Sequence, residues 1–151
     1  MNNKYYTVCG IVPIEGKILL VRHTYGMAKD KLLLPGGYVK EGELPTETVA
    51  REIREETGVV CRARSLLAMQ FTTKQWCAVF LTDYLEGTPV SDGHENSEVV
   101  LLTPDEALAR DDLTYMSREI LKAYRRQVPT LEKSDYIGRF HTPDDYVIFG
   151  V

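Results

Sequence analysis

Residues 32–59 read LLLPGGYVKEGELPTETVAREIREETGV, and this stretch combines a strand end, a tight turn and a helix. Its initial apolar run is stopped by Pro35 and two glycines, which permit backbone conformations that other residues avoid. Residues 46–57 read as a helix, because Pro45 suits a first helical turn and Gly58 suits the position just past a helix end. The stretch therefore predicts a loop, a helix and a second loop in succession.

The predicted helix carries three carboxylates on one face. Glu52, Glu55 and Glu56 are spaced i, i+3 and i+4, whereas Val49 and Ile53 form a separate apolar stripe that would dock the helix on a sheet. Like charges at this spacing repel, and a hard divalent cation with oxygen ligands would offset the repulsion. The glycine turn can add a backbone carbonyl. The pattern predicts a cup for Mg²⁺ or Mn²⁺ and a phosphate substrate, with a solvated acidic surface as the alternative.

The formal charge of −4 is concentrated in one segment. Residues 41–58 contain six glutamates and two arginines, and the rest of the 151 residues balance. The overall composition, 44% hydrophobic and 26% charged, is typical of one globular domain. The acidic balance argues against nucleic-acid binding, and neither a membrane span nor a signal peptide is apparent. We therefore expect a cytoplasmic protein without membrane or specific nucleic-acid partners.

The three cysteines are widely spaced and form no C-x-x-C pair, so they indicate neither a disulfide framework nor a zinc site. They are Cys9, Cys61 and Cys77.

Outside residues 32–59 the sequence predicts strands around a few helices. Strands are expected at 5–13, 17–23, 59–72, 76–85 and 98–103, with a hairpin turn at Glu15-Gly16, a helix start capped by Thr103 and Glu106, and a helix over 116–126. This order predicts an α+β or mixed-sheet α/β sandwich in one domain over residues 1–151. Residues 128–151 show no clear periodicity and receive no assignment.

The glycines and charged residues of the opening stretch match the Nudix box, G-x5-E-x7-R-E-U-x-E-E-x-G-U, where U is aliphatic. Every defined position is occupied: Gly37, Glu43, Arg51, Glu52, Ile53, Glu55, Glu56, Gly58 and Val59. The chain thus resembles the Nudix hydrolase family. The resemblance implies an α/β/α sandwich with a mixed sheet, in which the box forms a loop–helix–loop. It also implies an enzyme that uses Mg²⁺ or Mn²⁺ to hydrolyse a nucleoside diphosphate linked to another moiety X.

The resemblance also assigns roles to residues of the box. Glu52, Glu55 and Glu56 would be metal ligands, together with the carbonyl of Gly36. Glu43 and Arg51 would pair and hold the loop against the helix, while Gly37 and Gly58 would serve the turn and the cap.

The resemblance leaves the general base open among four glutamates. It would lie within the box, at Glu55 or Glu56, or on a later segment, at Glu95 or Glu98, of which we favour Glu98. Arg51 completes the set of catalytic residues that we expect.

Substrate contacts are expected around the box. Arg22, Tyr25 and Lys31 precede it, in a region where Nudix proteins often contact substrate, and Arg22 could bind a phosphate in bidentate fashion. Trp76, the only tryptophan, could stack on a base. The alternatives are surface roles for the polar residues and core packing for Trp76.

The box indicates the reaction but not the moiety X. The small size favours a nucleoside triphosphate or a nucleotide sugar, with ADP-ribose or a dinucleoside polyphosphate as alternatives. A nucleotide-sensing module without turnover is a further alternative, although such modules commonly lack box glutamates. Aromatic residues of the last segment would pack on the domain or on a second subunit of a homodimer: Tyr136, Phe140, Tyr146 and Phe149.

Overall fold

The structure, a computed structural model, describes residues 4–151 and contains two β-sheets. The strands of the first sheet lie in the order β5 (Gly36–Tyr38), β1 (Tyr5–Ile11), β7 (Gln75–Glu86), β6 (Val60–Phe71) and β9 (Leu131–Glu132). Strands β1 and β7 run parallel, whereas the other neighbours are antiparallel. This is the mixed sheet that the sequence predicts.

The second sheet is antiparallel and smaller. Strand β3 (Lys17–His23) is its centre and pairs with β2 (Pro13–Ile14), β4 (Leu32–Leu33) and β8 (Asn96–Leu102). The hairpin between β2 and β3 turns at Glu15 and Gly16, both with positive φ, as predicted.

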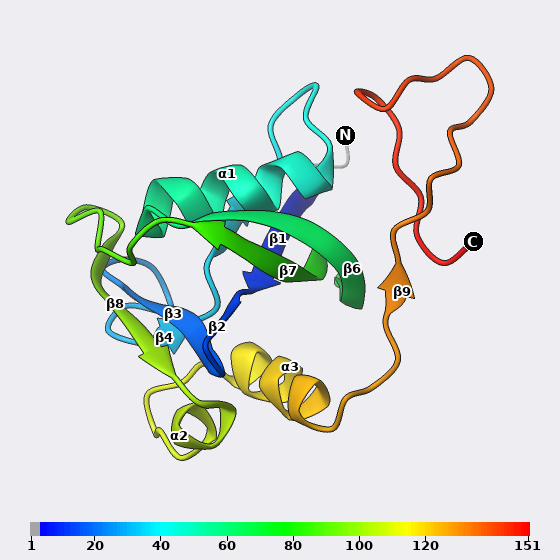
Figure 1. Cartoon of the computed structure of the whole chain (residues 1–151). Coiled ribbons are helices and arrows are strands. Elements are labelled where there is room, and N and C mark those ends of the chain that lie inside the picture. The colour runs from blue at the N-terminus through cyan, green and yellow to red at the C-terminus, as the bar shows by residue number, and fades with distance from the viewer. Residues whose placement is uncertain (1–3) are drawn as a thin grey trace.

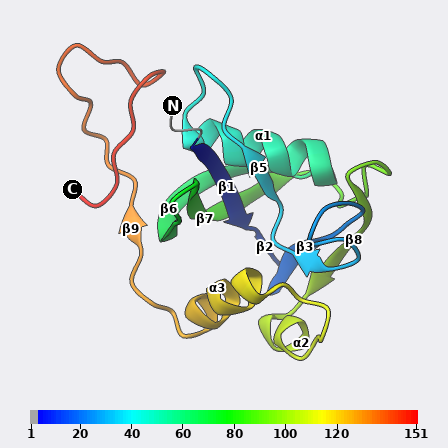
Figure 2. The same ribbon diagram turned by 180° about the vertical axis from the view of Figure 1, so that it is seen from behind.

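Two helices cover opposite sides of the first sheet, and Figures 1 and 2 show this sandwich from front and back. Helix α1 (Pro45–Thr57) buries Val49 and Ile53 against Val8 and Phe80 of the sheet. On the other side, α3 (Tyr115–Arg125) buries Ile120 and Leu121. The short α2 (Pro104–Leu108) precedes it. The apolar stripe of α1 therefore docks that helix as predicted.

The helix boundaries also follow from the sequence. Helix α1 begins at Pro45, and Gly58 ends it with φ of 75°, a left-handed conformation that glycine adopts at little cost. The Thr103 hydroxyl accepts a hydrogen bond from the N–H of Glu106, whose carboxylate accepts one from the N–H of Thr103 in return. This confirms the predicted capping box.

The prediction of one strand over residues 5–13 is wrong, because the chain changes sheets near Val12. Ile11 ends β1 and Pro13 begins β2 in the other sheet. Ile11 and Val12 are both fully buried, one in each of the two apolar clusters of the core. A continuous strand would point only one of these neighbours toward a given core face.

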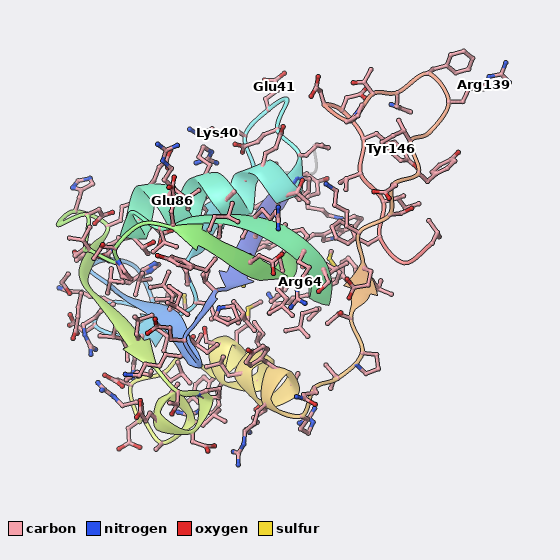
Figure 3. All side chains as sticks on the ribbon, viewed as in Figure 1. Lys40, Glu41, Arg64, Glu86, Arg139 and Tyr146 are labelled. Carbon is pink, nitrogen blue, oxygen red and sulfur yellow. The ribbon has the colours of Figure 1, made fainter. Side chains whose placement is uncertain are left out.

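The last segment, residues 128–151, pairs briefly with the first sheet and then loops outward. Strand β9 pairs with β6, and Lys133 bridges to Phe149. Phe149 packs on Phe80 with ring centroids 5.7 Å apart. Figure 3 shows Arg139 and Tyr146 on the loop between Lys133 and Phe149, and this loop extends away from the sandwich. In the part of the chain that the structure describes, no helix is long and apolar enough to cross a membrane.

The packing of α1 can be tested at Ile53. We expect Ile53→Ala to lower the free energy of unfolding by about 2–5 kcal/mol, because a fully buried side chain would be replaced by a cavity. Urea unfolding followed by circular dichroism measures this. Arg54→Ala, at an exposed position of the same helix, serves as control and should cost less than about 1 kcal/mol. Equal effects of the two substitutions would contradict the docking of α1 through Ile53.

Candidate metal and catalytic site

Three carboxylates from two separate elements meet beside the C-terminal half of α1. Glu52 and Glu56 come from α1 and Glu95 from the loop before β8, and each places an oxygen within 4.8 Å of the other two. The backbone N–H of Gly36 donates to Oε1 of Glu56 at 3.3 Å. The cluster therefore joins β5, α1 and the loop between β7 and β8.

Glu56 is the buried member of this cluster. It is only 3% exposed, and its Oε2 atom accepts no hydrogen bond from any residue within 4–151. Burial, together with the charge of Glu52, raises the pKa of Glu56 to about 8. Burial also raises the pKa of Glu52. Grouped carboxylates of this kind favour either protonation or a bound cation.

A hard divalent cation fits the donor set. Mg²⁺ and Mn²⁺ prefer carboxylate oxygens, and the buried, unpartnered oxygen of Glu56 lacks the hydrogen bond that a buried carboxylate normally makes. Glu52, Glu56 and Glu95 would hold such an ion.

Glu55 lies apart from the cluster, although it belongs to the predicted set of metal ligands. Its side chain is exposed, and Nη1 of Arg51 donates to its Oε2 at 3.1 Å. Glu55 and Arg51 are one helical turn apart, and the Glu55 carboxylate pairs with this arginine at the exposed surface of α1. The i, i+4 spacing of Arg51 and Glu55 is a sequence signal that could have indicated this ion pair.

Arg51 and Glu43 form the pair that the resemblance implies. Nε and Nη2 of Arg51 donate to the two oxygens of Glu43 at 2.6 and 3.0 Å. Nη2 also donates to the Tyr38 carbonyl, and Nη1 donates to Glu52 at 2.8 Å. The Arg51 guanidinium lowers the pKa of Glu43 to about 2. The arginine thus joins the loop before α1 to a carboxylate of the cluster.

Two glycines allow the loop to approach the helix closely. A Cβ atom on Gly37 would lie 2.3 Å from the Glu52 carboxyl carbon, and one on Gly36 would lie 2.0 Å from the Val8 carbonyl oxygen. Both distances are far below van der Waals contact, so any side chain here would displace the site. This supports the structural role expected of Gly37.

Glu98 and Arg22 contact each other instead of the cluster. In the register of β3 with β8 they are cross-strand partners, and Nε of Arg22 donates to Glu98 at 2.8 Å. Nη1 of Arg22 donates to Asp112 at 2.9 Å and to the Asp30 carbonyl. Our preference for Glu98 over Glu95 as base therefore has no support in the geometry, because Glu98 neutralises Arg22. The same contacts occupy Nε and Nη1 of Arg22, the arginine that we expected to bind a phosphate.

The other predicted substrate contacts are exposed. Tyr25 stacks on His23 with centroids 5.2 Å apart, and partial burial together with the nearby charges of Glu95 and Glu56 raises its pKa. Lys31 is on the surface. Trp76 is 41% exposed and meets Phe71 edge to face. Of these residues, Tyr25 has a pKa that burial and the charges of the cluster raise. The exposure of Trp76 excludes a role in core packing.

Sequence reasoning missed Asn96, which is completely buried beside the cluster. Its Nδ2 donates to the main-chain carbonyl of Glu56 at 2.8 Å. A single asparagine at the first position of a strand belongs to no periodic pattern, so its contact is visible only in the fold.

Comparison with known proteins agrees with this geometry. The sequence model described as NUDIX domain matches residues 4–124. The chain belongs to the Nudix family. A NUDIX hydrolase from Nitrosomonas europaea superposes with a TM-score of 0.77 at 25% identity, covering 84% of this chain and 73% of that one.

Two curated Nudix relatives match over part of their length. An ADP-ribose pyrophosphatase of Methanocaldococcus jannaschii is 44% identical over 62 residues, which are 41% of this chain and 37% of that protein. The phosphatase NudJ of Escherichia coli K12 is 33% identical over 85 residues, 56% of this chain and 52% of that protein. The matches thus span between a third and about half of these relatives.

The Glu43–Arg51 pair predicts a pH-dependent contribution to stability. The folded-state pKa of Glu43, about 2, lies below the value of about 4.3 for an unfolded chain, so the pair stabilises above that value and its contribution is lost as pH falls toward 2. Glu43→Gln should lower the unfolding free energy at pH 7 by about 1–3 kcal/mol. The difference from wild type should shrink between pH 4.5 and 2.

Urea unfolding across that pH range measures the effect, with Glu41→Gln in the same loop as control. A difference between Glu43→Gln and wild type that stayed constant with pH would contradict the ionic nature of the pair.

Proposed function

We propose that this chain is a Mg²⁺- or Mn²⁺-dependent Nudix pyrophosphohydrolase that cleaves nucleoside diphosphates linked to another moiety, with nucleoside triphosphates or nucleotide sugars as the favoured substrates. One observation carries the proposal: three carboxylates lie within 4.8 Å of one another, and one of them is buried with an unpartnered oxygen. The relative named ADP-ribose pyrophosphatase makes ADP-ribose the second candidate.

The residues of the chain have separate tasks in this reaction. A bound cation would screen the phosphate oxygens and lower the pKa of water. Arg51 holds Glu52 and the N–H of Gly36 holds Glu56, so both carboxylates are positioned as ligands that would hold the ion. Arg51 is occupied by four acceptors, three carboxylates and one carbonyl, so we assign it a positioning role.

The proton of the attacking water needs a carboxylate acceptor. Glu98 is paired with Arg22 and Glu55 with Arg51, whereas Glu95 lies in the cluster on a different element from the other two glutamates. We therefore assign the proton acceptor to Glu95, which would also hold the ion together with Glu52 and Glu56.

Glu56→Gln tests the assignment of the buried ligand. The substitution keeps the shape of the side chain but removes its charge, so we expect metal-dependent turnover to fall by at least about a hundredfold while the protein stays folded. The assay is phosphate release from a panel of nucleotides with Mg²⁺ or Mn²⁺, with and without chelator. Circular dichroism checks the fold, and Glu119→Gln on α3 is the matched control.

Full activity of Glu56→Gln would remove the ligand assignment. A wild-type protein that binds nucleotides tightly but hydrolyses none of the panel would instead support the sensing module.

A further inference from the structure

The loop between β7 and β8 crosses the C-terminal end of α1 (Figure 1). Carbonyl groups in the last turn of a helix lack partners within the helix. Here the loop and the first residue of β8 supply two of the missing donors. The N–H of Val90 in the loop donates to the Thr57 carbonyl at 2.9 Å, and Nδ2 of Asn96 donates to the Glu56 carbonyl at 2.8 Å. The loop is therefore anchored to α1 at two points, one on each side of its exposed tip.

Three hydrogen bonds hold Asn96, of which the bond from its side chain to Glu56 is the first. Its main-chain N–H donates to Asp92 at 3.1 Å, and its carbonyl accepts from the Ser91 hydroxyl at 3.0 Å. Because the Glu56 carbonyl can only accept, the side-chain atom that faces it must be the amide nitrogen. Asn96 is thus a fixed point at the base of a mostly exposed loop.

Glu95 directly precedes this fixed point. Its carbonyl accepts hydrogen bonds from both the N–H and the hydroxyl of Thr24, at 3.1 Å each. Its carboxylate faces Glu52 and Glu56. The Asn96 hydrogen bond ends on the main chain of Glu56, so one side-chain contact links the backbone segments that carry two of the three clustered carboxylates.

Repulsion between the carboxylates gives the hydrogen bond between Asn96 and Glu56 a function. Ionised carboxylates within 4.8 Å of one another repel, and the exposed loop that carries Glu95 is the part least enclosed by the fold. A hydrogen bond between the base of this loop and the helix opposes their separation and keeps the site organised before an ion arrives.

We propose that Asn96 is a positioning residue, whose hydrogen bond to the Glu56 main chain holds Glu95 at the distance from α1 that binding of a divalent cation requires. The proposal rests on the proposed function for its link to turnover. The cation affinity that it predicts can be measured without any substrate.

The test compares two buried hydrogen bonds in the full-length chain. Asn96→Leu removes the amide donor and keeps a side chain of similar shape. Thr82→Val is the matched control, because the buried Thr82 hydroxyl donates to the Ile11 carbonyl at 2.9 Å on the first sheet, outside the cluster. Mn²⁺ dissociation constants come from electron paramagnetic resonance, and melting temperatures are measured with chelator. Asn96→Ala replaces Asn96→Leu if the latter does not fold.

We expect both substitutions to lower the melting temperature, but only Asn96→Leu to weaken Mn²⁺ binding, by about tenfold or more. A double-mutant cycle with Glu95→Gln separates positioning from general loosening. If Asn96 acts through Glu95, adding Asn96→Leu to Glu95→Gln should change Mn²⁺ affinity less than about twofold.

Wild-type Mn²⁺ affinity in Asn96→Leu would overturn the proposal. So would a tenfold weakening that persists in the Glu95→Gln background, since Asn96 would then act without Glu95. Absence of turnover in the wild-type protein would overturn the proposed function alone, because these binding measurements use no substrate.

Discussion

Repulsion between carboxylates is the constraint on which the rest of this structure depends. Glu52, Glu56 and Glu95 are close together, and Glu56 is almost completely buried. Like charges in such a place cost free energy unless a cation or a proton compensates them. The surroundings offset only part of that cost, since Arg51 reaches Glu52 but Oε2 of Glu56 has no partner within residues 4–151.

Contacts made by uncharged groups hold the carboxylates together. The apolar stripe of α1 fixes the helix on the sheet, the glycines at 36 and 37 let β5 approach Glu52 and Glu56, and Asn96 ties the loop to the helix end. Each of these contacts involves a different part of the chain. The site therefore depends on the assembled sandwich more than on the helix that carries most of its charge.

Local features of the chain were predictable because their causes are local. The bounds of α1 follow from Pro45 and Gly58, and the cap of α2 follows from Thr103 and Glu106. The pairing of Glu43 with Arg51 followed from the family motif. The break of the first strand at Val12 was not predictable, because it depends on which core each buried neighbour enters.

Part of the composition of the cluster was beyond sequence reasoning for a similar reason. Helical spacing places Glu55 with Glu52 and Glu56, but the Glu55 side chain is exposed and pairs with Arg51 outside the cluster. Strand register pairs Glu98 with Arg22 and leaves Glu95 to complete the cluster. The choice between Glu95 and Glu98 is made by long-range strand pairing, which a single sequence does not display, whereas the Arg51–Glu55 pair is local.

The most direct test of this account is the melting temperature of the wild-type protein and of Glu56→Gln at pH 7, with chelator and with Mn²⁺. With chelator, the variant should be at least as stable as wild type, because the amide carries no charge that a proton or a cation would have to compensate. Mn²⁺ should raise the melting temperature of wild type and leave that of the variant nearly unchanged. Equal melting temperatures of wild type with chelator and with Mn²⁺ would contradict the claim that the cluster exists to bind a cation.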